Sequence, residues 1–334
     1  MAFQEADGAF HSKTYGPFRD GRAVTPLVLL ALWAAPEQRG LDAAYRRGVD
    51  FLAAAGADPQ AYPVYTLSTT LLALGSPRND RHAAVREPLA AALRARQKED
   101  GGWSYFDEPS NLSSALFAIG ALRLAGAAAD DPALVRARGF VERCQNFAAG
   151  EGAPDARFDD GGFFHSPDLP DGNKAGAAGT DAAGRPRFRS YGSMTADGVR
   201  ALLRLGAAPT DPRVVAARRW LVAHFSADRN PGEFPARDEV RGASSYYYWV
   251  WSAAHAMRAL GRQPGQELGK GAWAEPLADT LLVKQAEDGA WRNPTTEMRE
   301  DDPLVATPFA MAALSVARTV ISGELRSHAA DAHR

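Results

Sequence analysis

Two ionisable residues, Asp197 and His255, occupy matching positions in two segments of helical sequence. Each lies two residues after the start of an apolar run, at residues 195–202 and 253–260. If the two runs form neighbouring helices, the side chains lie at one height, where a carboxyl–imidazole hydrogen bond can form. Burial would raise the pKa of Asp197 and suit it to general-acid catalysis with His255 as its partner. Alternatively, Asp197 is a helix-start carboxylate and His255 is a core histidine.

Asp301 and Asp302 form a second acidic candidate, just ahead of the apolar run 307–314. Carboxylates at the mouth of a helical ring can act as acids toward a bound molecule. They can equally be N-terminal charges that the helix dipole favours and that have no further role.

Aromatic residues gather in the same layers as these acids. Rings that face a cavity can hold an apolar chain and stabilise a carbocation by cation–π attraction. The alternative is that these rings, at helical spacing, are ordinary core packing, and the sequence is compatible with both roles. The candidate substrate-binding residues are Tyr65, Phe117, Tyr246, Tyr247, Tyr248, Trp251 and Phe309.

No motif in the sequence indicates a metal or a cofactor. The acidic pairs lack the third acid of an Asp-Asp-x-x-Asp magnesium site, and no His-x-His or Cys-x-x-Cys spacing occurs. The one cysteine, Cys144, is expected at the end of a covering helix, away from the interior. We therefore expect no metal site and no cofactor.

The candidate residues depend on helices that arrange them around one centre. Apolar segments ending in Ala-Leu or an equivalent alternate with segments that have apolar residues at three- and four-residue spacing. This alternation predicts an all-α fold, an (α/α)6 barrel or toroid of six inner and five to six outer helices. The sixth outer helix would come from residues 316–325 or from a segment ahead of the chain as given. The inner segments are 25–32, 67–74, 115–122, 195–202, 253–260 and 307–314, and the outer ones 41–55, 84–98, 133–147, 212–225 and 273–285.

A turn motif, Gln-x-x-Asp-Gly-x-aromatic, recurs ahead of the inner segments. It appears at 4–10, 97–103 and 285–291, with looser copies at Gln145 plus 160–163 and at 230–234. Such repetition indicates one structural unit used several times. We expect residues 1–334 to form a single toroid domain with an irregular insertion at about 150–189, and loops of that length in a compact domain are usually functional or mobile.

Composition narrows the classes of partner. The 334 residues are 46% hydrophobic and 23% charged with a net charge of −2, and Lys and Arg form no sustained run, so we expect no nucleic-acid partner. The longest apolar stretch, 24–35, is shorter than the roughly 20 residues that cross a bilayer, and the N-terminus lacks the pattern of a signal peptide. We expect a cytoplasmic protein without a transmembrane segment, for which peripheral membrane contact stays open.

The Gln-x-x-Asp-Gly-x-Trp turns resemble the QW repeats of squalene–hopene and oxidosqualene cyclases and of the related prenyltransferase β-subunit toroids. Three further segments are similar to bacterial single-domain proteins with prenyltransferase and squalene oxidase repeats. The resemblance spans nearly the whole chain and implies a toroid in which Gln, Gly and Trp tie the end of an outer helix to the next turn. The three segments are SYGSMTADG at 190–198, DPRVVAARRWL at 211–221 and NPGEF at 230–234.

The resemblance also implies where a cyclase would hold its proton donor. These enzymes protonate an alkene with an Asp-x-Asp-Asp-Thr-Ala motif at the start of an inner helix. No acid occupies the corresponding places, so the motif is absent and Asp197 would be an acid displaced by one turn. The corresponding residues are Ala23, Tyr65, Ser113, Ser193, Trp251 and Val305.

The sequence thus favours a terpene cyclase-like enzyme that acts on an isoprenoid by general-acid chemistry in an aromatic cavity. The alternative is a non-catalytic toroid that carries a hydrophobic ligand or serves as a scaffold. A carbohydrate-active barrel would need paired carboxylates roughly 5–10 Å apart across a cleft. The mouth acids could supply such a pair, but the QW-like turns argue against that class.

Overall fold

The computed structural model describes residues 3–34, 41–56, 62–75, 77–148, 155–261 and 272–331. Every inner and outer helix predicted from the periodicity is present, and a short helix, α9 (Glu239–Ala243), precedes α10. The inner helices are α1 (Thr25–Ala34), α3 (Val64–Leu74), α5 (Leu112–Leu124), α7 (Gly192–Arg204), α10 (Tyr246–Gly261) and α12 (Pro303–Asp331). The outer helices are α2 (Leu41–Ala55), α4 (Ala83–Ala95), α6 (Pro132–Arg143), α8 (Pro212–His224) and α11 (Ala274–Val283).

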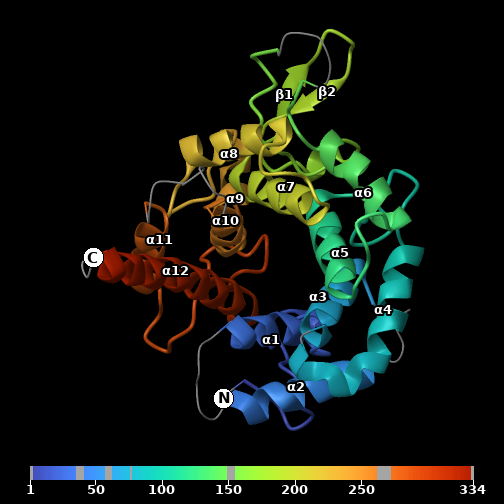
Figure 1. Ribbon diagram of the computed structural model, residues 1–334, viewed down its shortest axis with the longest axis vertical. Helices are drawn as coiled ribbons and strands as arrows, with labels where there is room; N and C mark the ends of the chain where they lie inside the picture. The colour runs from blue at the N-terminus through green and yellow to red at the C-terminus, as the bar shows by residue number, and fades with distance from the viewer. Residues whose placement is uncertain are drawn as a thin grey trace.

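The inner helices close into a ring, and the outer helices surround it (Figure 1). Each inner helix packs against the next one, and α12 packs against both α10 and α1, so that the first and last helices meet. The sequence reflects the two layers: α5 is buried at every position from Leu112 to Leu122, whereas α2 buries a single stripe. A helix buried on all sides is apolar all round, and a covering helix needs only one apolar face. The protein is an (α/α)6 toroid, as predicted.

The repeated turns fasten neighbouring outer helices together. In the turn between α4 and α5, the Gln97 Nε2 donates to the carbonyl of Gly101 at 2.8 Å and to the carbonyl of Ala133 in α6 at 2.7 Å. Gly101 has a φ of +87°, and a Cβ there would lie 2.3 Å from the carbonyl oxygen of Arg136. Glycine is therefore required both for the left-handed backbone and for the close approach to α6.

The same geometry recurs in two other turns, including the one that the insertion interrupts. The equivalent bonds to the next outer helix run from Gln4 to Ala44 of α2 at 2.7 Å and from Gln145 to Arg213 of α8 at 2.9 Å. Where the aromatic residue of the turn is tryptophan, its indole N–H binds the preceding outer helix. Trp103 Nε1 donates to the carbonyl oxygen of Leu93 in α4 at 2.8 Å. The role that the resemblance implied for Gln, Gly and Trp is thus present in the structure.

The turn at Gln285 keeps this internal geometry, but no outer helix lies against it in the described part of the chain. Gln285 Nε2 donates to the carbonyl of Gly289 at 2.8 Å, and the glutamine is exposed. Residues 316–325, considered above for a sixth outer helix, are instead part of α12, which continues without a break from Pro303 to Asp331. That expectation is wrong, because no residue in the segment interrupts the helix. The described outer layer has five helices.

The insertion between α6 and α7 contains a small hairpin that lies outside the ring (Figure 1) and that the sequence analysis did not predict. Strand β1 (Ala177–Thr180) pairs antiparallel with β2 (Pro186–Phe188). The strands are too short to show an alternation of apolar and polar residues, which explains why the pattern was not recognisable.

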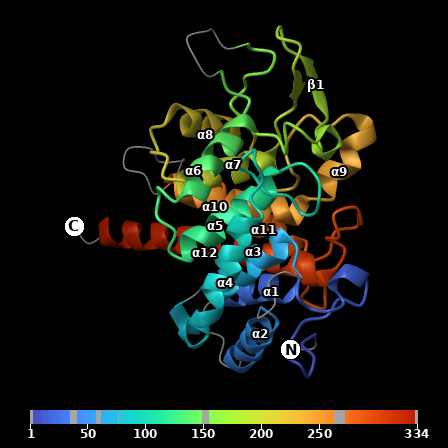
Figure 2. The same ribbon diagram turned by 90° about the vertical axis from the view of Figure 1, so that its right-hand side faces the viewer.

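Helix α12 is the described helix that is long and apolar enough to cross a membrane, over residues Pro303–Gly323. A core helix of a folded ring has the same composition, and α12 packs between α1 and α10 along its first half. Its last turns project beyond the ring (Figure 2).

Two matched glutamine variants test the turn. Gln97→Ala removes three hydrogen bonds, one within the turn and two to Ala133 and Arg136 of α6, and we expect it to lower the free energy of unfolding by about 1–3 kcal/mol. Gln285→Ala removes only a bond within an exposed turn and should change stability by less than about 0.5 kcal/mol. Urea unfolding of both variants measures the difference, and equal losses would contradict the role assigned to the turn.

Candidate functional site

A cavity of about 430 Å³ lies where the inner helices begin. The N-terminal segment covers one side of it through Phe18 and Arg22. Because the N-termini of the inner helices meet at this face, their dipoles all place partial positive charge toward it. Every inner helix contributes a wall residue near its start, among them Leu27, Tyr65, Ser113, Met194, Tyr248 and Phe309.

Stacked aromatic rings form the floor of the cavity. Tyr65, Tyr248 and Phe309 line the cavity there, and Phe117 and Trp251 pack against these three rings. The Tyr65 and Phe117 rings are 4.6 Å apart, and Phe117 stacks on Trp251 at 5.3 Å. Tyr248 meets Phe309 edge to face at 5.5 Å. The predicted aromatic layer therefore exists, and three of its members are available to a ligand.

Tyr246 and Tyr247 point away from the cavity, in contrast to the expectation that the whole Tyr246–Tyr248 run faces a ligand. Their hydroxyls donate to the carbonyls of Ala227 at 2.8 Å and Arg292 at 3.3 Å. Successive residues of a helix point about 100° apart, so only Tyr248 of the three faces the lumen.

Asp197 is fully buried behind Tyr248 and is not a wall residue of the cavity. The Tyr248 hydroxyl donates to its Oδ2 at 2.6 Å, the Ser252 hydroxyl donates to its Oδ1, and an Arg200 guanidinium nitrogen lies 3.6 Å from Oδ1. Burial raises the pKa of Asp197 to about 6, although Arg200 and the two hydroxyls oppose the shift. The carboxylate thus accepts two hydrogen bonds and pairs electrostatically with Arg200.

His255 does not bind Asp197, which corrects the pairing considered above. Its Nδ1 lies 2.9 Å from the carbonyl oxygen of Trp251, one turn earlier in α10. Burial, with Arg200 close by, lowers the pKa of His255 well below its usual value, so the ring is neutral at pH 7. Matching sequence positions predict how far along their helices the Asp197 and His255 side chains lie only to within one turn. In the structure, Tyr248 and Ser252 of α10 are the residues that lie level with Asp197 and bind it.

Arg200 is the positive partner in this buried ion pair, and its guanidinium group lies over the Trp251 ring, where a bound cation would otherwise lie. It is 5% exposed, donates to the Ser252 hydroxyl at 2.9 Å, and its guanidinium carbon lies 4.2 Å from the centre of the Trp251 ring. The face of Trp251 is therefore already engaged in a cation–π contact. A bound molecule has access to the rings on the cavity wall instead.

Asp301 and Asp302 fasten the N-terminal segment and do not line the cavity. Asp302 accepts a backbone N–H in the first turn of α12 at 2.9 Å and the Ser12 hydroxyl. Asp301 accepts the Tyr15 hydroxyl at 2.6 Å, and this hydrogen bond raises the pKa of Tyr15 to about 12. Asp302 therefore matches the alternative of a helix-start charge, whereas Asp301 binds Tyr15 of the N-terminal segment.

Three acids line the cavity, Asp20, Glu297 and Glu300, and of these only Glu300 is buried. The sequence analysis missed Glu300 although it directly precedes Asp301. Glu300 is 1% exposed, and its two carboxyl oxygens accept the backbone N–H groups of Tyr248 at 2.8 Å and Tyr247 at 2.9 Å. Asn293 donates to it at 3.1 Å. Burial outweighs these hydrogen bonds and raises the pKa of Glu300 to about 7.

Lys174 also lies on the cavity wall, and the sequence did not reveal it. It comes from the insertion, and nothing in the helical register relates it to the ring. Burial lowers its pKa to about 8, with Arg241 acting in the same direction and Glu300 against it. The cavity thus holds a carboxyl group and an amine that both change protonation near neutral pH.

The donor sets for a metal are absent from the described residues: no cluster of three or more His, Cys, Asp or Glu side chains occurs there. Cys144 is buried at the end of α6, where the sequence predicted it, and burial raises its pKa. The arrangement supports proton transfer by side chains to an apolar molecule that sits on aromatic rings.

Comparison with known proteins agrees with this architecture. A family model, the squalene–hopene cyclase N-terminal domain, matches residues 66–148. The resemblance to terpene cyclase toroids is confirmed. No curated protein matches the chain.

Solved structures share the fold over nearly the whole chain. The GH76A α-1,6-mannanase from Salegentibacter sp. HEL1_6 has a TM-score of 0.64 at 11% identity, covering 95% of both chains. A variant of the type II terpene cyclase MstE from Scytonema, in complex with geranylgeranyl dihydroxybenzoate, has a TM-score of 0.61 at 11% identity, covering 96% of this chain and 93% of that one. A protein from Actinoplanes has a TM-score of 0.57 at 17% identity, covering 96% of both. At these identities the similarity shows the fold alone.

The pH dependence of stability tests the environment of Glu300. A folded-state pKa of about 7, above the usual value of 4.5, means that the protonated carboxyl stabilises the fold at low pH and that this contribution is lost as the pH rises through 7. Relative to Glu300→Gln, the wild-type free energy of unfolding should fall by about 3 kcal/mol between pH 4.5 and 8. Glu233→Gln, at an exposed position, should keep the wild-type profile, and an identical profile for Glu300→Gln would contradict the assignment.

Removing one member of the buried ion pair should be strongly destabilising. Asp197→Asn leaves Arg200 buried without a negative partner, and we expect a loss of about 3–5 kcal/mol in thermal or urea unfolding. The exposed pair of Asp288 and Arg292, at 2.7 Å, provides the control, because Asp288→Asn should lose less than about 1 kcal/mol. Similar losses at both sites would show that Asp197 and Arg200 do not form a desolvated pair.

Proposed function

We propose that the protein is a terpene cyclase-like enzyme that binds an apolar isoprenoid in the cavity and acts on it by general-acid chemistry, with Glu300 as the acid. One observation carries the proposal: a buried carboxyl group lies on the wall of a cavity whose floor is aromatic. Aromatic and aliphatic walls favour an apolar molecule, and a few placed polar groups determine how it is oriented.

The acid strength of Glu300 indicates what it can protonate. A group with a pKa of about 7 is divided between its two protonation states at neutral pH, which is the condition that favours general acid–base catalysis. Such an acid gives its proton to an oxygen atom far more readily than to an alkene carbon. We therefore propose an isoprenoid that carries an oxygen function near Glu300, such as an alcohol, an epoxide or a carbonyl group.

Tyr248 and Asp197 would support the reaction from beneath. The Tyr248 hydroxyl donates a hydrogen bond to Asp197, which leaves the oxygen lone pairs and the ring face of Tyr248 to meet developing positive charge in the cavity. Burial raises the pKa of Tyr248 well above its usual value, so the phenol stays protonated. Asp197 acts here as a positioning residue, because it reaches the cavity only through Tyr248.

Two other functions use the same fold. The mannanase among the similar structures is a carbohydrate-active enzyme, but the carboxylates considered for that chemistry, Asp301 and Asp302, are bound to the N-terminal segment and to α12. A carrier of hydrophobic molecules would need the cavity and not the acid. Turnover separates the carrier from the enzyme.

The proposal predicts that purified protein converts an oxygen-bearing isoprenoid to a new product detectable by gas chromatography and mass spectrometry. Glu300→Gln should lower this turnover at least 100-fold, because the proton donor is lost. The variant should still bind farnesol, as measured by quenching of tryptophan fluorescence. Exposed Glu233 supplies the control, and Glu233→Gln should retain wild-type turnover.

Binding without turnover in the wild type would instead support the carrier. Absence of binding by every isoprenoid tested would contradict the proposal as a whole.

A further inference from the structure

We propose that Lys174 is a nucleophilic amine that captures the carbonyl group of an isoprenoid aldehyde as an imine. The inference rests on the proposed function, because it concerns the same cavity. It narrows the substrate class to an apolar aldehyde and assigns a role to the insertion, which brings Lys174 to the cavity wall.

The backbone on the N-terminal side of Lys174 is fixed by its neighbour. Asn173 is 1% exposed, its side-chain oxygen accepts the backbone N–H of His165 at 2.8 Å, and its amide donates to the carbonyl of Ser166 at 2.8 Å. Arg241 of α9 donates to the carbonyl of Asp171 from the other side. The lysine stem therefore starts from a defined position at the edge of the cavity.

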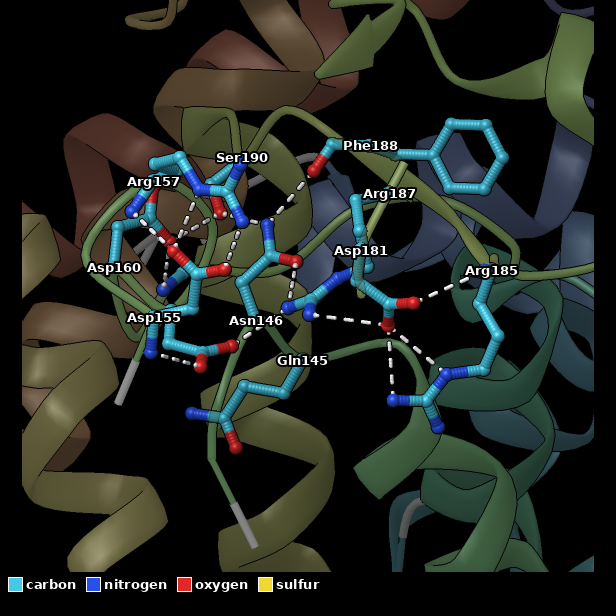
Figure 3. A network of polar contacts seen from close by, with 12 residues as sticks. Gln145, Asn146, Asp155, Arg157, Asp160, Asp181, Arg185, Arg187, Phe188 and Ser190 are labelled. Carbon is cyan, nitrogen blue, oxygen red and sulfur yellow. Dashed lines mark hydrogen bonds and ion pairs between the residues drawn. The ribbon is translucent and has the colours of Figure 1, made fainter. Parts of the chain in front are cut away.

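The chain after Lys174 is held by a network of polar contacts on the outer side of the ring (Figure 3). Arg187 of β2 pairs with Asp159 at 2.6 Å, and the Asn146 amide donates to the carbonyl of Phe188 at 2.8 Å. Ser190 donates to the Asp160 carboxylate at 2.7 Å, which binds the hairpin to the turn ahead of α7. The insertion is thus anchored on both sides of Lys174.

The side chain of Lys174 forms no hydrogen bond and no ion pair with any residue that the structure describes. The charged groups that act on it are Arg241 from α9, Asp197 from α7, and Glu297 and Glu300 from the loop ahead of α12. An amine without a partner, partly desolvated and at a cavity wall, loses its proton more easily than an exposed lysine does. Such lysines serve as Schiff-base nucleophiles.

The cavity also supplies the other requirements of imine formation. The neutral amine attacks the carbonyl carbon, a C–N bond forms, and the carbonyl oxygen takes up the proton lost by nitrogen to give a carbinolamine. Glu300 then protonates the departing hydroxyl, which leaves as water, and the product is a protonated imine with Glu300 as its carboxylate. The aromatic floor holds the apolar chain and limits the access of water that would reverse the step.

Reductive trapping tests the inference on the full chain. The protein is incubated with farnesal and cyanoborohydride at pH 7.5, and the adducts are found by intact mass and peptide mapping. We expect one adduct, heavier by the mass of the aldehyde less one oxygen, on Lys174. It should form at least about tenfold faster than on Lys13, which is exposed.

Matched variants locate the reaction. Lys174→Arg keeps the positive charge and should abolish the fast adduct, Lys174→Met should do the same, and Lys13→Arg should leave it unchanged. Glu300→Gln should slow its formation at least about tenfold, because the hydroxyl then departs without its acid. Labelling spread over the exposed lysines, with Lys174 no faster than Lys13, would overturn the inference.

Farnesol separates this inference from the proposed function, because an alcohol cannot form an imine. Quenching of tryptophan fluorescence by farnesol in the wild type, without an adduct on Lys174, would overturn the imine and leave the isoprenoid site intact. No binding of either molecule would overturn both. Fast labelling of Lys174 together with farnesol binding by Lys174→Arg would support both and show that the variant is folded.

Discussion

The toroid depends on the close contact that three Gln-containing turns, those of Gln4, Gln97 and Gln145, make with the following outer helix. The glutamine amide bridges its own turn and a carbonyl in that helix, as Gln97 does to Ala133, and the glycine lets the two backbones approach. Because each turn ends where an inner helix starts, the contact fixes the height at which that helix begins. The inner helices therefore begin at one face, and the cavity lies there.

The lumen has two levels with different chemistry. At the level of the cavity, Glu300 and Lys174 face a space lined by aromatic rings, near the positive ends of the helix dipoles. Below the aromatic floor, Asp197 pairs with Arg200, and Arg204 follows one turn later near the end of α7. Burial lowers the pKa of Arg204 to about 9, whereas the negative end of the helix dipole favours a cation at that place. Tyr248 connects the cavity with the buried ion pair, because it lines the cavity and its hydroxyl group donates a hydrogen bond to Asp197.

Helix periodicity and the repeated turns were sufficient to predict the fold, because both arise from local contacts and from burial on one face or on all faces. The aromatic layer followed from the same register. Asp197 and His255 show its limit: a register places a residue on a face to within a turn, but the choice of Tyr248 and Ser252 as partners depends on side-chain geometry. Glu300 and Lys174 lie in loops without periodicity, so only the packed ring shows that they share a cavity.

The most direct test of this account is a crystal structure of the protein with bound farnesol. The account predicts density for the isoprenoid chain in the cavity, against Tyr65, Tyr248 and Phe309, with the hydroxyl group toward Glu300 and Lys174. Density at another site, or a chain bound with its hydroxyl group pointing away from these two residues, would contradict it.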